Sequence, residues 1–246
     1  EINQKIKAVF PDFTPYQEEL NSAFSHYKHY YPESKTPFVV TFYSNFNAMA
    51  FPYKDTLGIG LDMFLGRDEE IVTRLTPDYY PQYLKDDMDP EFLISETIKN
   101  WIYSRHSQQG EYESSSQYGV RKDFLSTLIY HGKMMLLTEA LLPNKSMENL
   151  FSYSKKETEW CLKNEKFIYQ NLVQYKLIYS TNTKEILAYV NPGSFTPGLP
   201  QESPGGLGKW IGYRMVKNYF QETEISLQEL ISQKNDERKI LRMYRF

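Results

Sequence analysis

His131 has the surroundings that come nearest to a known catalytic pattern in this chain. In zinc hydrolases of the His-Glu-x-x-His kind, two histidines share one helix face and the glutamate activates the metal-bound water. Here Gly132 occupies the glutamate position and Met135 occupies the position of the second histidine. Methionine is a poor zinc ligand, and a catalytic zinc ion needs about three protein ligands. The pattern therefore favours a packed, hydrogen-bonded histidine, and we expect no metal and no cofactor.

Acidic residues keep a metal-dependent site open as an alternative. Glu139 follows His131 by two helical turns and lies roughly 80° around the helix from it. A metal-dependent hydrolase with an unorthodox ligand set would use His131 together with Glu139 or Glu165.

Other chemistry-bearing residues have plainer explanations. His26 and His29 stand three residues apart, but no acidic or cysteine pattern completes a ligand set around them. Cys161, the only cysteine, is expected to be a small buried thiol, although His131 is a conceivable base for it. One cysteine also excludes an intrachain disulfide.

A glycine- and proline-rich stretch over residues 192–208 leads into a helix, an arrangement that can cradle phosphate. A Walker pattern ending at Gly208-Lys209 would need glycine at 203 and serine or threonine at 210, where Ser203 and Trp210 stand. We therefore expect Ser203 and Pro204 to start the helix, with the glycines serving close packing or positive φ.

Composition excludes several classes of protein. The net charge is −3 with both signs mixed along the chain, so nothing indicates a nucleic-acid-binding surface. Hydrophobic residues make up 41%, which is typical of a globular fold. No apolar run approaches the ~20 residues that span a bilayer. The chain starts at Glu1 without Met, so a signal peptide or lipid-anchored cysteine is expected in a segment outside this sequence.

Helical patterns dominate the elements that must position these residues. Helices are predicted over residues 1–31 with a break at Pro11 and a restart capped by Thr14, from residue 89 to about 102, over 123–142, from Ser154 to about 175, over 207–220 and over 227–232. Helix 123–142 is apolar around much of its circumference, so we expect it to be central. Ser154 and Glu157 form a capping box. Residues 107–118 are polar and predicted to form a surface loop.

A small sheet is predicted between the first helices and the helical remainder. Residues 38–43 are rich in β-branched and aromatic side chains, a turn is expected at 44–47, and further short strands are expected at 48–51 and 57–61. Short connections favour an antiparallel arrangement. The fold class is therefore α+β, mainly helical, in a single domain over residues 1–246.

Several motifs in order between residues 57 and 221 resemble those of GldB-type gliding-motility lipoproteins. The similar segments are 61–66, His131-Gly132-Lys133, 139–143, Trp160-Cys161 with Asn164-Glu165, 189–193, 195–198, and 202–205 running into 210–216. The segment 210–216 is long enough to be specific.

This resemblance implies a cell-envelope lipoprotein, lipid-anchored and facing the periplasm, that works with gliding or type IX secretion machinery. It also implies distant similarity to predicted zinc-dependent proteases, with a zincin-like fold in which the sheet 38–61 packs on helix 123–142. We expect a non-catalytic protein that binds an envelope protein or peptide through a degenerate protease-like groove. A purely structural lipoprotein is a further alternative. The candidate groove residues are His131, Lys133, Glu139, Glu202, Tyr213 and Arg214.

Overall fold

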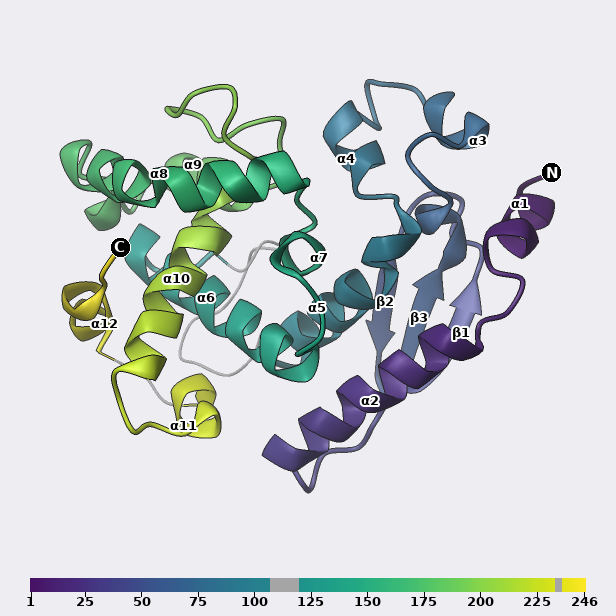
Figure 1. Ribbon diagram of the computed structural model, residues 1–246, viewed down its shortest axis with the longest axis horizontal. Coiled ribbons are helices and arrows are strands. Elements are labelled where there is room, and N and C mark those ends of the chain that lie inside the picture. The colour runs from purple at the N-terminus through teal and green to yellow at the C-terminus, as the bar shows by residue number, and fades with distance from the viewer. Residues whose placement is uncertain (107–119, 233–235) are drawn as a thin grey trace. The chain divides into compact units, whose positions relative to one another are not determined.

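The computed structural model describes residues 1–106, 120–232 and 236–246, and it confirms a mainly helical α+β chain (Figure 1). The chain divides into two compact units. The first comprises Glu1–Ser104 and Thr138–Ser152, and the second comprises Arg105–Leu137 and Tyr153–Phe246. The loop predicted at 107–118 lies outside the described residues. Among the described helices, none has the length and apolar character needed to cross a bilayer.

The first unit combines short helices with one sheet. Its elements are α1 (Ile2–Val9), α2 (Thr14–Tyr30), β1 (Phe38–Phe42), β2 (Ala50–Tyr53), β3 (Thr56–Gly60), η1 (Leu61–Phe64), α3 (Glu70–Thr73), α4 (Gln82–Asp86), η2 (Pro90–Phe92), most of α5 (Leu93–His106), the end of α6 (Phe124–Leu141) and α7 (Met147–Phe151).

Helix α2 buries the stripe that its helical spacing predicts. Leu20, Ala23, Phe24 and Tyr27 are all buried. The rings of Phe24 and Tyr27 lie 4.9 and 4.7 Å from that of Trp101 on α5, both in edge contacts. The predicted cap at Thr14 is wrong by one residue, because Phe13 precedes the helix and Asp12 accepts a hydrogen bond from the Thr14 N–H.

Polar contacts join the separate segments of the first unit, and they include bonds of Ser152 with Lys99 and Glu96. The His26 Nδ1 atom lies 2.9 Å from the carbonyl oxygen of Leu141, and Lys145 Nζ lies 2.7 Å from Glu19 Oε2. A ring nitrogen beside a carbonyl oxygen must carry a proton, so Nδ1 of His26 donates and is not available as a metal ligand.

The sheet has the strand order β1-β3-β2 and is mixed (Figure 1). Strands β2 and β3 form the expected antiparallel hairpin, but β1 pairs with β3 in parallel, from Phe38 with Thr56 to Phe42 with Gly60. The expectation of a wholly antiparallel sheet is therefore wrong. The cause is topological: β3 separates β1 from β2, so the chain must cross β3 before the hairpin begins.

Asp62 holds the turn between β1 and β2. Its buried carboxylate accepts hydrogen bonds from Ser44 N, Ser44 Oγ and Phe46 N at 2.8, 2.9 and 2.6 Å. Asn45 and Phe46 both have positive φ, which costs free energy in residues with a side chain. Three bonds to one carboxylate offset that cost and satisfy a buried charge.

The second unit is helical. It contains the end of α5, most of α6, α8 (Lys155–Gln174), η3 (Leu177–Tyr179), α9 (Thr183–Val190), α10 (Leu207–Gln221), α11 (Leu227–Ser232) and α12 (Glu237–Met243). Helix α10 packs against α8, α9 and α12 (Figure 1).

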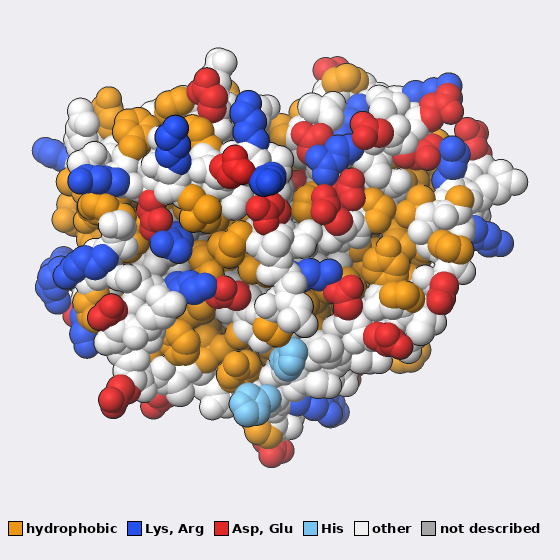
Figure 2. Space-filling view, viewed as in Figure 1, with side chains coloured by type: hydrophobic (Ala, Val, Ile, Leu, Met, Phe, Trp, Pro, Cys, Tyr) orange, Lys and Arg blue, Asp and Glu red, His pale blue; other side chains and the backbone are white. Residues whose placement is uncertain are grey.

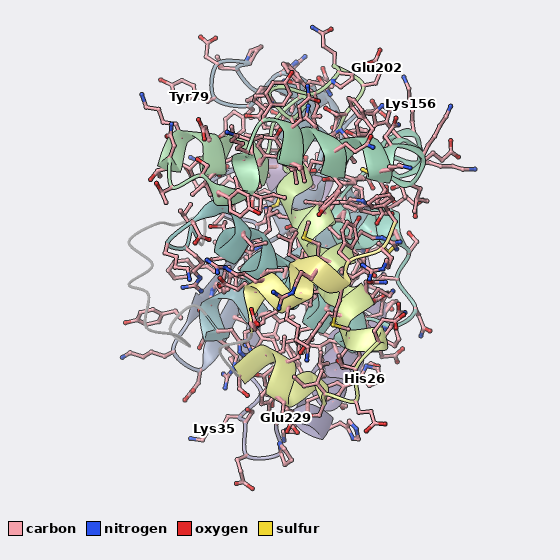
Figure 3. The ribbon with its side chains drawn as sticks, turned by 90° about the vertical axis from the view of Figure 1, so that its left-hand side faces the viewer. His26, Lys35, Tyr79, Lys156, Glu202 and Glu229 are labelled. Atoms are coloured by element: carbon pink, nitrogen blue, oxygen red, sulfur yellow. The ribbon has the colours of Figure 1, made fainter. Side chains whose placement is uncertain are left out.

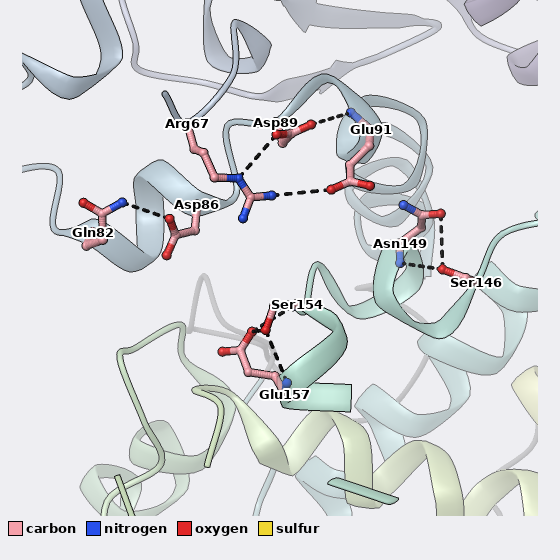
Figure 4. A network of polar contacts seen from close by, with 9 residues as sticks. All are labelled: Arg67, Gln82, Asp86, Asp89, Glu91, Ser146, Asn149, Ser154 and Glu157. Atoms are coloured by element: carbon pink, nitrogen blue, oxygen red, sulfur yellow. Dashed lines mark hydrogen bonds and ion pairs between the residues drawn. The ribbon is translucent and has the colours of Figure 1, made fainter. Parts of the chain in front are cut away.

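Sequence signals placed the longest helices of this unit well. Helix α6 matches the apolar prediction over 123–142, and the apolar side chains around it are buried: Leu125, Leu128, Ile129, Met135, Leu136, Leu137 and Leu141. Helix α8 starts at the predicted capping box, in which Ser154 and Glu157 exchange hydrogen bonds between side chain and backbone (Figure 4).

Hydrogen bonds within the segment before α10 hold it in place. Thr196 is buried, its hydroxyl donates to the Pro204 carbonyl at 2.7 Å, and Leu207 N donates to that hydroxyl at 3.3 Å. Gly206, with φ +67°, precedes the helix, so the predicted start at Ser203 and Pro204 is wrong. A left-handed residue is needed where the chain turns into α10, and glycine adopts that conformation without a steric penalty.

Candidate functional site

Helices α6 and α10 cross where glycine faces glycine. A Cβ atom added to Gly132 would lie 2.2 Å from the Gly212 carbonyl oxygen, and one added to Gly212 would lie 2.0 Å from that of Leu128. Gly208 is also close to both Leu128 and Tyr189. Any larger residue at 132 or 212 would push the helices apart. Gly132, which stands where a zinc hydrolase has its glutamate, is therefore a packing residue.

The neighbours of these glycines are buried. His131 and Met135 are each 2% exposed, and Tyr213 on α10 is 0% exposed. The Tyr213 hydroxyl accepts a hydrogen bond from Lys217 Nζ at 2.7 Å, and the His131 ring makes an edge contact with Tyr130. Predicted groove residues 131 and 213 are thus part of the interior of the second unit.

Lys133 lies one residue beyond the glycine contact, close to Arg121 and Glu237. Burial lowers the pKa of its ammonium group to about 8, the carboxylate of Glu237 opposes this shift, and Arg121 adds to it. Glu237 also accepts a hydrogen bond from Ser126 and pairs with Lys122. Burial is the largest of these effects, so the ammonium form of Lys133 is destabilised.

A buried carboxylate joins three segments of the second unit. Glu165 on α8 accepts hydrogen bonds through Oε1 from Arg214 Nε at 2.9 Å and from the Tyr244 hydroxyl at 2.6 Å. The Glu165 side chain is 9% exposed, whereas that of Arg214 is 34% exposed. The pKa of Arg214 is raised: burial opposes its charge, but the hydrogen bond and the charge of Glu165 outweigh burial. Burial and the same carboxylate raise the pKa of Tyr244.

The chain end packs onto this carboxylate cluster. The Tyr169 ring contacts those of Tyr244 and Phe246 at 5.4 and 5.6 Å, and the Lys166 ammonium lies over the Phe246 ring. Arg245 N donates to Asn218 on α10. These contacts hold the last residues against α8 and α10.

The six predicted groove residues differ in burial, and they do not all belong to the same unit. Arg214 is partly exposed, and Glu202 is exposed on the loop before α10 (Figure 3). Lys133 is partly buried, and Glu139 lies in the end of α6 that belongs to the first unit. Arg214 and Tyr213 are neighbours on α10, and the Tyr213 ring adds to the raised pKa of Arg214.

The groups that a metal site, a reactive thiol or a phosphate site would use make structural contacts or are buried. Oε1 of Glu165 already accepts hydrogen bonds from Arg214 and Tyr244. Cys161 is fully buried, and burial raises the pKa of its thiol, which is the opposite of a reactive cysteine. Leu207 N, at the start of α10, donates within the loop and not to a phosphate site. Within the described ranges, no three His, Cys, Asp or Glu side chains gather as metal ligands.

Sequence reasoning missed two participants in this region. Tyr244 has no motif around it, and its role depends on a carboxylate 79 residues away. Gly212 is inside the recognised segment 210–216, but its partner Gly132 becomes visible only when α6 and α10 are packed. The face in Figure 2 shows Lys and Arg side chains interspersed with Asp and Glu, as the mixed charge pattern predicts.

Of three comparisons with known proteins, only the one with family models found a match. No curated protein and no solved structure matches the chain. A family model described as gliding motility protein GldB matches residues 1–246, which is the whole chain. This match includes the motifs at the crossing of α6 and α10 and around Glu165. The chain therefore belongs to the GldB family of gliding motility proteins.

Proposed function

We propose that this protein is a non-catalytic, lipid-anchored component of the cell envelope, facing the periplasm, that binds a protein partner of the gliding or type IX secretion machinery. Membership of the GldB family indicates involvement in gliding motility and association with the cell envelope. The observation that carries the non-catalytic part is the contact of Gly132 with Gly212. The expected relation to zinc-dependent proteases belongs to this proposal and rests on sequence resemblance.

The glycine contact argues against hydrolysis on the helix of His131. A general base at position 132 needs a side chain, and even a Cβ atom there overlaps the Gly212 backbone. His131 and Met135 are almost fully buried, so a substrate would have to displace packed side chains to reach them. Opening a packed helix crossing costs several kcal/mol, on the order of a large core substitution.

Arg214 is the residue best suited to contact a partner. Its Nε atom is fixed by Glu165, while a third of the side chain stays exposed. A guanidinium held in this way loses little conformational entropy when it binds, and its terminal nitrogens match the geometry of a carboxylate. Exposed Glu202 is a second candidate contact. The buried residues His131 and Tyr213 position the helices in this proposal and do not touch the partner.

The test compares three variants with the same tag in intact cells: Arg214→Gln, Glu165→Gln, and the matched control Arg238→Gln at an exposed arginine. Each strain is scored for protein level, for partners captured after cross-linking in the envelope, and for colony spreading. We expect Arg214→Gln to lose a specific partner at normal protein level, Glu165→Gln to capture less of it because Arg214 is no longer held in place, and Arg238→Gln to keep it.

Two outcomes would overturn the proposal. Capture of the same partners by Arg214→Gln and Arg238→Gln at equal protein level would show that Arg214 takes no part in binding. Stoichiometric zinc in protein purified without chelator, together with peptidase activity that depends on His131, would establish the metal-dependent hydrolase instead.

A further inference from the structure

One face of the three-stranded sheet in the first unit is made of exposed apolar side chains. Phe38, Val40 and Phe42 alternate along β1, and the strand register places them on the same face as Phe51 and Tyr53 of β2. The exposed fractions are 73% for Phe38, 40% for Val40, 36% for Phe42, 58% for Phe51 and 58% for Tyr53. We call these five residues the aromatic face.

The other face of the same sheet is buried at its central strand. Leu57 and Ile59 of β3 point away from the aromatic face and are 0% exposed. On the aromatic face, the centre of β3 is Gly58, and the Phe42 ring lies over it, with Cε1 2.8 Å from where a Cβ would be. The missing side chain lets the Phe42 ring extend from β1 over β3, toward the side of the sheet where Phe51 and Tyr53 of β2 lie.

The exposed apolar area of the aromatic face is comparable with that of the largest apolar patch on a typical soluble protein. At about 200 Å² for a large aromatic side chain, the exposed fractions correspond to roughly 500 Å² of apolar surface. Patches of this size on soluble proteins commonly mark interaction sites. The area is smaller than the roughly 800 Å² per partner that a stable protein–protein interface buries, so the face alone does not fit a dimer with a second copy.

Strand β1 adds an open backbone edge beside the aromatic face. It lies at the end of the strand order, and among the residues that the structure describes it pairs only with β3 (Figure 1). Phe38 N donates to the Asp55 carbonyl at 2.7 Å, so Phe38, Val40 and Phe42 direct their backbone groups toward β3. Because successive residues alternate, the N–H and C=O groups of Val39 and Thr41 point to the open side.

We infer that β1 and the aromatic face together bind an extended segment of a protein partner, which adds a fourth strand to the sheet. The backbone of the segment pairs with Val39 and Thr41, and every second side chain lies over the aromatic face. A lipid surface is disfavoured, because the open N–H and C=O groups would lose their hydrogen bonds to water in hydrocarbon.

The chemistry of the segment follows from the charges around the sheet. Glu33 and Lys35 precede β1, and Lys54 and Asp55 form the turn of the hairpin, so the local charges balance. The surface therefore offers no charge complementarity to a strongly acidic or basic segment. It favours a segment with alternating β-branched or aromatic side chains and little net charge. This surface is separate in sequence from Arg214, so the inference does not depend on the proposed partner of that residue.

The test uses a defined probe with the whole protein. The probe is a fluorescent nine-residue peptide that alternates threonine and valine between terminal lysines. Its matched control has the same side chains but N-methyl groups on the amides of one edge, which removes hydrogen-bond donors and keeps the apolar surface. Binding is measured by fluorescence anisotropy, and amide hydrogen exchange reports protection at Val39 and Thr41.

We expect the peptide to bind and to slow exchange at both amides, and the N-methylated peptide to bind at least tenfold more weakly. Thr41→Pro removes one outward N–H on an edge strand, where proline is tolerated, and should weaken binding by a similar factor. The double variant Phe38→Thr with Phe51→Thr should also weaken it at least tenfold. A fold check by circular dichroism accompanies each variant.

Several results would overturn the inference. Equal binding of the two peptides would mean that the edge takes no part, and absence of peptide binding would remove the site. Sedimentation with neutral phosphatidylcholine vesicles that depends on Phe38 and Phe51 would assign the face to lipid. Concentration-dependent dimers that vanish in the same double variant would assign it to a second copy of this chain.

Discussion

The crossing of α6 and α10 in the second unit and the three-stranded sheet in the first unit use glycine next to aromatic residues in opposite ways. At the crossing, Gly132 and Gly212 let two backbones approach, and the large residues around them are buried. In the sheet, Gly58 lets the Phe42 ring lie flat, and the large residues beside it remain exposed. The first arrangement buries large side chains between two helices, and the second leaves them exposed to solvent.

This contrast changes where chemistry is sought. The residues with a catalytic look, His131 and its neighbours, lie at the closed crossing and stabilise the fold. The exposed surface is built from ordinary phenylalanine and tyrosine, which no catalytic motif would single out. The free energy of unfolding and its dependence on pH measure how differently the two units respond to substitution.

The largest effect is expected at the crossing. Gly132→Ala and Gly212→Ala each place a Cβ about 2 Å from a backbone oxygen that cannot move without its helix. Overpacking of this kind costs about 3 kcal/mol. Urea denaturation measures the loss. Gly193→Ala is the control, since its Cβ would meet only the Phe195 oxygen at 3.3 Å. A loss no greater than that of the control would show that the crossing is not tight.

Removal of the Glu165 charge should have the next largest effect. In Glu165→Gln, Arg214 loses its ionic partner and Tyr244 loses a charged acceptor. Breaking a buried pair costs 3 to 5 kcal/mol, and the partial exposure of Arg214 reduces this to about 2 kcal/mol. Tyr244→Phe removes one hydrogen bond and should cost about 1 kcal/mol. Equal stability of Glu165→Gln and the unmodified protein would contradict the role of this cluster.

Lys133 gives a smaller effect with a defined pH range. Its pKa falls from 10.5 to about 8 on folding, so the unfolded chain binds more protons between these values and stability rises with pH there. Lys133→Met removes the ammonium group and should stabilise the protein by about 1 kcal/mol below pH 8, since partial exposure and Glu237 reduce the full penalty. The difference between the two proteins should disappear above pH 10.5. A difference that is independent of pH would refute the burial of this charge.

The smallest effect is expected on the aromatic face. Phe38→Thr and Phe51→Thr replace side chains that are 73% and 58% exposed, and threonine suits a strand. Each should change the free energy of unfolding by less than about 0.5 kcal/mol, as for surface positions in general. Thermal unfolding followed by circular dichroism is sufficient. A loss above about 1 kcal/mol would mean that these rings are part of the core.

Local patterns predicted much of the helical part. Apolar spacing located α5, α6 and α10 within a few residues, and Ser154 with Glu157 marked the start of α8. These signals depend on residues three or four positions apart, which the chain itself keeps adjacent. Helices α7 and α9 have eight residues or fewer, so each contains too few turns for a repeated apolar pattern to identify it.

Long-range relations could not be predicted in the same way. The parallel pairing of β1 with β3 depends on which edge of the hairpin β1 meets, and no local pattern encodes that choice. The need for glycine at 132 depends on a backbone 80 positions later, and the burial of Glu165 depends on Tyr244. The site residues were recognised as part of similar motifs, but their physical roles required the packed structure.

The division of the chain also limits how the protein can be cut. The first unit includes Thr138–Ser152, and its two segments are joined by the bond of His26 to Leu141 and the ion pair of Lys145 with Glu19. A truncation after residue 104 would therefore leave α2 without these partners. No single protease nick or gene truncation yields either unit complete, so a fragment that fails in cells would reveal nothing about which unit carries the activity.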